Sequence, residues 1–224
     1  MKRASLMIVL LLMVALTLTV SAQVRVGIIG GFNFSDMEGT GEREVSGKTV
    51  FGVGCMLDLG LWKDFSLCLE PMYIQKYAIA EEIDIENPAI DVKLAFLECP
   101  VFLKYSFGNT IRPYFIAGPA IGYLLSSEME INLGGITFEA NTKEITEKLD
   151  IGLGFGGGIS ISTGPCSVFL EGRYTLGLNN LNKGGVVIAS AGPLHIEGDI
   201  PESDKMKNRG VQLMAGISLS LSGR

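Results

Sequence analysis

The chain has 224 residues, with 18 basic and 24 acidic side chains and a formal net charge of −6. This length is enough for one domain with a sizeable core. The acidic balance and the lack of a basic cluster argue against nucleic acid as a partner.

Residues 1–22 have the pattern of a secretory signal peptide. Lys2 and Arg3 form a basic start, Leu6–Val20 is apolar, and small residues end at Ala22 before a cleavage point. The apolar run is shorter than the roughly 20 residues that a membrane-spanning helix needs. We therefore predict a cleaved signal peptide, 1–22, followed by one mature domain, 23–224. Loss of Lys2 and Arg3 would take the net charge from −6 to −8.

Eight later segments alternate apolar and polar residues. They are Val24–Phe34, Lys48–Gly60, Phe65–Tyr77, Asp91–Ser106, Arg112–Ser126, Leu149–Ser162, Ser167–Leu178 and Arg209–Leu221. A period of two is typical of a β-strand, whose side chains point alternately to opposite faces. The mature chain has no long apolar run, so it can enter a membrane only as a closed barrel.

The connections between these segments alternate between short and long. The short ones are Leu61–Asp64, Phe107–Ile111 and Thr163–Cys166, and the long ones are 35–47, 78–90, 127–148 and 179–208. Transmembrane barrels have short periplasmic turns and long extracellular loops. We predict an all-β fold, an 8-stranded antiparallel up-and-down transmembrane β-barrel surrounded by lipid of the bacterial outer membrane. Two long connections also contain hairpin patterns, around Gly134-Gly135 and, less regularly, within Gly185–Ile196.

Charged side chains in the middle of the segments share one strand face, opposite an apolar face. They are four acids and four bases: Asp58, Glu70, Lys76, Glu98, Lys104, Arg112, Glu171 and Arg173. An isolated buried charge costs several kcal/mol, and an 8-stranded barrel is just wide enough for side chains to fill it. We therefore predict an ion-pair network in a polar, largely filled lumen. Glycines on the same face, including Gly154 and Gly158, would leave room for the long side chains.

Aromatic residues, among them Trp62, Tyr77, Tyr105 and Tyr114, gather toward the segment ends. This placement suits the interfacial girdles of membrane barrels.

The four cysteines are far apart in the sequence. By strand parity, Cys55 and Cys99 lie on the apolar face, Cys68 lies on the opposite face, and Cys166 lies in a turn. Four cysteines in an exported chain could form two disulfides, but these parities favour free thiols.

Six stretches carry a resemblance to a known family through their order and spacing. They are Val24–Ser35, Leu69–Lys76, Leu97–Tyr105, Arg112–Pro119, Glu171–Leu178, and Asn208-Arg209 followed by the final strand. Together they resemble the PorT-like outer-membrane β-barrel proteins of Bacteroidetes. The resemblance implies an integral outer-membrane barrel but no single activity, since some members serve protein secretion and many have no assigned role.

No signature of catalysis or cofactor binding stands out. Gly152–Gly157 matches G-x-G-x-x-G, but a strand pattern follows it rather than the helix that dinucleotide binding requires. His195 is the only histidine, and no G-x-S-x-G pattern surrounds the nearby serines. There is no C-x-x-C pair for a metal. We expect no enzyme activity, no cofactor and no metal.

Three functions remain open on the sequence. The first is a structural, adhesion or secretion-accessory role, with envelope or secretion-system proteins contacting the loops. The second is a narrow channel for small solutes or ions. The third is an exported soluble β-barrel that binds an apolar ligand inside, with the two strand faces reversed.

Overall fold

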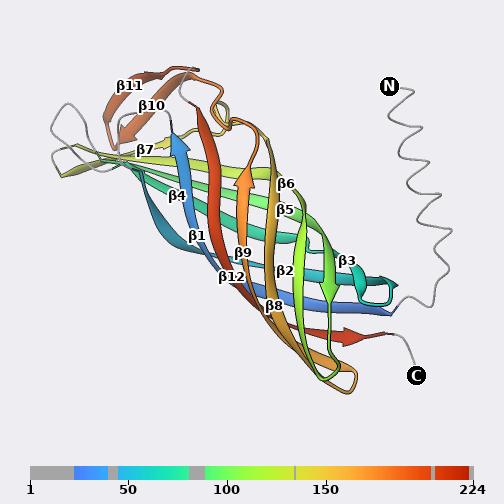
Figure 1. The fold of residues 1–224 in the computed structure, drawn as a ribbon. Coiled ribbons are helices and arrows are strands. Elements are labelled where there is room, and N and C mark those ends of the chain that lie inside the picture. The colour runs from blue at the N-terminus through green and yellow to red at the C-terminus, as the bar shows by residue number, and fades with distance from the viewer. Residues whose placement is uncertain (1–22, 40–44, 81–88, 134, 203–204, 222–224) are drawn as a thin grey trace, which may run out of the picture.

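A computed structural model describes residues 23–39, 45–80, 89–133, 135–202 and 205–221 (Figure 1). The predicted signal peptide, 1–22, lies outside the described residues. These residues form twelve strands, and they include no helix long and apolar enough to cross a bilayer. The strands are β1 (Val24–Gly39), β2 (Val45–Trp62), β3 (Phe65–Leu69), β4 (Met72–Ala80), β5 (Ala89–Ser106), β6 (Ile111–Leu133), β7 (Ile136–Asn141), β8 (Leu149–Thr163), β9 (Cys166–Gly177), β10 (Gly185–Ala191), β11 (Leu194–Ile200) and β12 (Met206–Ser220).

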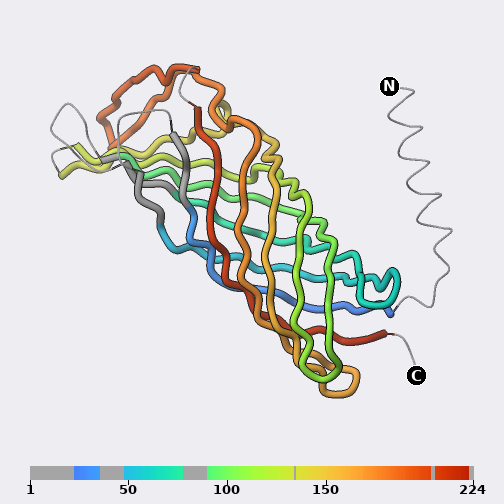
Figure 2. Tube along the Cα trace, viewed as in Figure 1, coloured from blue at the N-terminus to red at the C-terminus, as the bar shows by residue number. Residues whose placement is uncertain are grey.

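Antiparallel pairing closes the sheet into a ring. Its order is β1, β2, β3 with β4, β5, β6, β8, β9 and β12, which pairs with β1 again. The closing β1–β12 pair keeps its register from Arg25↔Ser220 to Gly39↔Met206. The start of β1 and the end of β12 lie at the end of the ring that carries the short turns (Figure 2). The predicted 8-stranded antiparallel barrel is confirmed, with β3 and β4 together in the place of one strand.

The third segment, Phe65–Tyr77, was predicted to be one continuous strand. This prediction was wrong, because the strand is interrupted at Glu70-Pro71. Proline has no backbone N–H to donate to a neighbouring strand. The wall nevertheless stays closed across the interruption. The N–H of Cys55 donates to the carbonyl of Pro71 over 3.0 Å, and the N–H of Glu70 donates to the carbonyl of Pro100 over 3.1 Å.

Several strands continue past their predicted ends at the long-loop end. β6 reaches Leu133, and β7 returns along it from Ile136, so the first predicted hairpin is confirmed. β10 and β11 form the second hairpin, which joins β7 through Ser190↔Glu139. We call β7, β10, β11 and residues 128–133 of β6 the outer sheet. It has a small apolar core of its own, formed by Phe138, Ala140, Val187 and Ala189.

Along the ring strands, exposed apolar side chains alternate with buried side chains, as in a membrane barrel. On β9, Val168 and Leu170 are 51% and 56% exposed, while Phe169, Glu171 and Arg173 are buried. The charged face therefore lies inside the ring and the apolar face lies outside, as lipid contact requires.

An aromatic row follows the outer surface at the short-turn end. The ring centroids of Trp62 and Phe65 are 4.8 Å apart, those of Phe65 and Tyr105 4.9 Å, and those of Tyr105 and Phe107 6.0 Å. The row has the position of an interfacial girdle. The expectation that Tyr77 and Tyr114 belong to such a girdle was wrong, because both side chains are buried.

The outer face offers a direct test of lipid contact. Leu170→Arg would place a charge near the middle of β9, and we expect the free energy of unfolding to fall by about 2–4 kcal/mol. Ile188→Arg is a matched control, because Ile188 is similarly exposed but lies on the outer sheet. Its effect should stay within about 0.5 kcal/mol. Denaturant unfolding in phosphatidylcholine vesicles, followed by Trp62 fluorescence, measures both. Equal effects at the two positions would contradict the assigned lipid face.

Candidate functional site

The charged residues that share a face in the sequence converge in the lumen. Seven of them are each at most 8% exposed: Asp58, Glu70, Lys76, Glu98, Lys104, Glu171 and Arg173. The eighth, Arg112, is half-buried at the short-turn end, and no ion pair joins it to a described residue. Five ion pairs arrange the other seven, together with Asp150, in three groups along the barrel axis.

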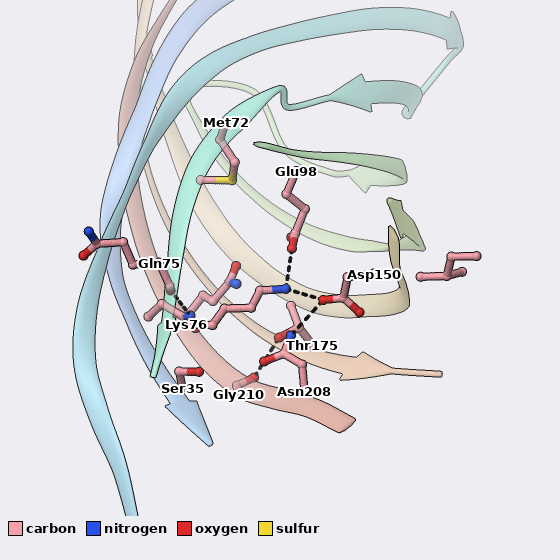
Figure 3. Close-up of polar contacts among 12 residues, drawn as sticks. Ser35, Met72, Gln75, Lys76, Glu98, Asp150, Thr175, Asn208 and Gly210 are labelled. Atoms are coloured by element: carbon pink, nitrogen blue, oxygen red, sulfur yellow. Dashed lines mark hydrogen bonds and ion pairs between the residues drawn. The ribbon is translucent and has the colours of Figure 1, made fainter. Parts of the chain in front are cut away.

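The first group surrounds Lys76 of β4 (Figure 3). Its Nζ donates to Glu98 Oε2 and to Asp150 Oδ2, each over 2.7 Å. Asn208 Nδ2 approaches the same Asp150 oxygen at 3.4 Å. These contacts join strands β4, β5, β8 and β12 across the lumen. The cavity beside them is only about 10 Å³, which is about the least that one water molecule needs.

The second group surrounds Arg173 of β9. Its Nη1 donates to Glu70 Oε2 and, over 3.3 Å, to Glu171 Oε1. Its Nε donates to Gln212 Oε1 over 2.5 Å. The thiol of Cys68 donates to the other Glu70 oxygen over 3.4 Å. The guanidinium therefore bridges the β9 side of the ring and the interrupted β3–β4 segment.

The third group lies nearest the short-turn end. Lys104 Nζ is 3.2 Å from Asp58 Oδ2. Tyr114 lies between this pair and the second group, because its hydroxyl donates to Glu171 Oε2 over 3.1 Å.

Each buried cation also rests on an aromatic ring. Lys76 Nζ is 4.8 Å from the centroid of Phe96, Lys104 Nζ is 4.1 Å from Tyr114, and Arg173 Cζ is 5.4 Å from Phe102. A cation over a ring face gains attraction from the ring quadrupole, and the gain is larger when water is excluded. The rings thus replace part of the hydration that the cations have lost.

Five residues that contact these groups were missing from the predicted network: Cys68, Tyr114, Asp150, Asn208 and Gln212. Asp150 has the same strand parity as Gly154 and Gly158, which the sequence analysis placed on the lumen face. Parity alone would therefore have found it, although it lies near the start of its strand.

The structure places the other candidate residues that it describes as follows. His195 Nδ1 lies 2.8 Å from Ser190 Oγ across the β10–β11 hairpin, and His195 is exposed. Gly152–Gly157 lies within β8. The four cysteines are unpaired. Within the described ranges, no group of three or more His, Cys, Asp and Glu side chains is arranged to hold a metal ion.

A closed antiparallel ring with an apolar outside and a charged, filled inside defines an integral outer-membrane β-barrel protein. Residues 19–183 match the model of the outer membrane protein β-barrel domain family. The chain belongs to that family, and its location is the bacterial outer membrane. The soluble alternative with an apolar interior is therefore wrong.

Two solved structures show the same fold at low sequence identity. The chain is similar to a major outer membrane protein of Thermus thermophilus, with a TM-score of 0.56 and 10% identity over 88% of this chain and 98% of that chain. It is also similar to OprG of Pseudomonas aeruginosa, with a TM-score of 0.51 and 9% identity over 90% and 98% of the two chains. Neisserial surface protein A gives a TM-score of 0.47 and 15% identity over 88% and 97%. No curated protein matches the sequence.

The Lys76 group leads to a prediction about stability. Lys76→Met leaves Glu98 and Asp150 buried without their cation, so we expect the free energy of unfolding to fall by about 3–5 kcal/mol. The triple variant with Glu98→Gln and Asp150→Asn should recover a large part of this loss, because no uncompensated charge remains. Lys148→Met, at an exposed position, serves as the control and should change stability by less than about 0.5 kcal/mol. Denaturant unfolding in vesicles gives all three values. A Lys76 effect no larger than that of Lys148 would contradict the assigned role.

Proposed function

We propose that this chain is a structural, adhesion or secretion-accessory protein of the outer membrane, and that its working surface is the outer sheet. The observation that carries the proposal is the filling of the lumen by buried ion pairs. A ring occupied by charged and aromatic side chains leaves no path for ordinary solutes. The features available to a partner then lie at the two ends of the barrel.

The edge of the outer sheet supports an interaction role. β11 is last in the strand order and pairs, among the described residues, with β10 alone. The free N–H and C=O groups of an edge strand are a template for the addition of another strand. One face of β11 carries His195, Glu197 and Asp199, and the other carries Leu194, Ile196 and Ile200. An extended partner segment that alternates apolar and basic residues would complement both faces.

The motif order supports a finer placement within the family. We propose that the chain is a PorT-like barrel, and that its partners are envelope or secretion-system proteins. A non-catalytic role fits this placement, since the Ser190–His195 contact is exposed and the other imidazole nitrogen has no acidic partner in the described part of the chain. The partner surface would be the outer sheet described above.

A narrow channel is the second candidate. Three buried polar atoms, Asn33 Oδ1, Asp150 Oδ1 and Gln212 Nε2, have no hydrogen-bond partner among the described residues. Buried polar atoms of this kind usually bind ordered water. A single file of water molecules past these atoms would favour a path for protons or small ions over one for larger solutes.

The outer-sheet proposal is tested by replacing residues 186–199 with a short Gly-Ser-Gly turn. Gly185 and Ile200 are cross-strand neighbours, so such a turn can connect them. We expect normal heat-modifiable gel mobility, because the ring contains neither β10 nor β11. Adhesion or secretion in the source bacterium should be lost.

A second variant keeps the hairpin. Glu197→Lys combined with Asp199→Lys reverses the charge on one face of β11 and should reproduce the loss. A chain without the hairpin that restores the full wild-type phenotype would contradict the proposal.

A further inference from the structure

The lumen opens at the short-turn end into a cavity of about 60 Å³ that the three ion-pair groups do not fill. This end faces the periplasm in barrels of this kind. The residues that matter here are Arg25 of β1, Asp58 of β2, Lys104 and Ser106 of β5, Arg112 of β6 and Ser160 of β8.

Positive charge exceeds negative charge around this cavity. Lys104 is already paired with Asp58 at 3.2 Å, and Lys63 and Asp64 offset each other in an exposed turn. Arg25 and Arg112 remain. Both are half-buried, and within the described structure neither is in an ion pair. They are close enough to repel each other, while Asp58, the cross-strand neighbour of Arg25, is close enough to attract it. Two like charges held together in this way create a site that attracts an anion.

One buried hydrogen-bond donor of the cavity lacks an acceptor. Arg112 Nε is buried and has no partner in the described part of the chain. A guanidinium carries five N–H donors in a fixed plane, and a buried donor without an acceptor is unfavourable. The hydroxyls of Ser106 and Ser160 line the same space. The cavity therefore offers many donors, and Asp58, its buried acceptor, is already engaged.

We propose that this cavity binds a phosphate group between Arg25 and Arg112. Guanidinium groups match the geometry of phosphate and carboxylate oxygens and bind them through paired hydrogen bonds. Two guanidiniums from different strands, together with serine hydroxyls, present more hydrogen-bond donors than the two coplanar oxygens of a carboxylate can accept. A tetrahedral oxyanion presents acceptors in several directions and satisfies more of these donors. The site lies at the opposite end of the barrel from the outer sheet and is independent of its function.

The test is isothermal titration calorimetry of inorganic phosphate into the full mature chain, in an uncharged detergent at low salt. We expect saturable binding by the wild type. Arg112→Gln and Arg25→Gln should each weaken it about tenfold or more, since each removes a charged hydrogen-bond donor. Lys183→Gln, at an exposed position near the long-loop end, should leave the Kd unchanged. Heat-modifiable gel mobility reports that each variant is folded.

Further titrants identify the source of the phosphate. Equal affinity for a soluble glycerol phosphodiester would assign the site to a lipid headgroup, and binding of inorganic phosphate alone would assign it to the free ion. If the two arginines only balance the negative charge deeper in the lumen, the wild type will give no saturable heat at millimolar phosphate. That result, or acetate binding as tightly as phosphate, would overturn the proposal.

Discussion

A charge inside this barrel has no bulk water to solvate it, and the rest of the structure depends on this constraint. Taking an ion out of water costs several kcal/mol unless a partner compensates. Lys76 and Arg173 each lie between two carboxylates, and Lys104 lies beside one. Each cation also has an aromatic ring against it. Three of these ion pairs, Lys76–Asp150, Arg173–Glu70 and Lys104–Asp58, connect parts of the wall that are not neighbours in the sheet, so they offset desolvation and also hold the wall together across the lumen.

The wall adapts to this interior. A Cβ atom on Gly158 would lie 2.6 Å from the Tyr114 ring, and one on Gly154 would lie 2.8 Å from Phe102. Gly154 and Gly158 therefore make room for the rings that support Arg173 and Lys104, whereas a Cβ atom on Gly156 would lie 2.6 Å from the Cβ of Arg173 itself. With the middle of the barrel filled, the surfaces left for recognition are its two ends. The outer sheet offers a strand edge at one end, and the arginine-lined cavity offers a cation pair at the other.

The ring and its two faces could be predicted from the sequence, because the face on which a side chain lies depends only on its position along its own strand. The sequence also placed Glu171 and Arg173 together, since they are two residues apart on one strand. It did not predict that Lys76 meets Asp150, 74 residues away, because contacts across the lumen depend on the stagger of strands around the ring. Tyr114 was assigned to the girdle because it lies near the end of a strand. Its strand parity, which it shares with Arg112, would have placed it correctly in the lumen. The hairpin patterns indicated that strands continue beyond the membrane around Gly134-Gly135 and within Gly185–Ile196. The extra residues at the long-loop ends of β1, β2, β4 and β5 were not predicted, because beyond the membrane the alternation fades while backbone pairing continues.

Single-channel recording in planar bilayers tests the filled lumen most directly. A filled lumen should give no steady conductance in the wild type, and steady openings in Arg173→Ala, which removes the side chain at the centre of the second group. Lys148→Ala, at an exposed position, should behave as the wild type. Steady openings in the wild type that grow larger in Arg173→Ala would contradict the account, because the lumen would then be an open path that the ion pairs merely narrow.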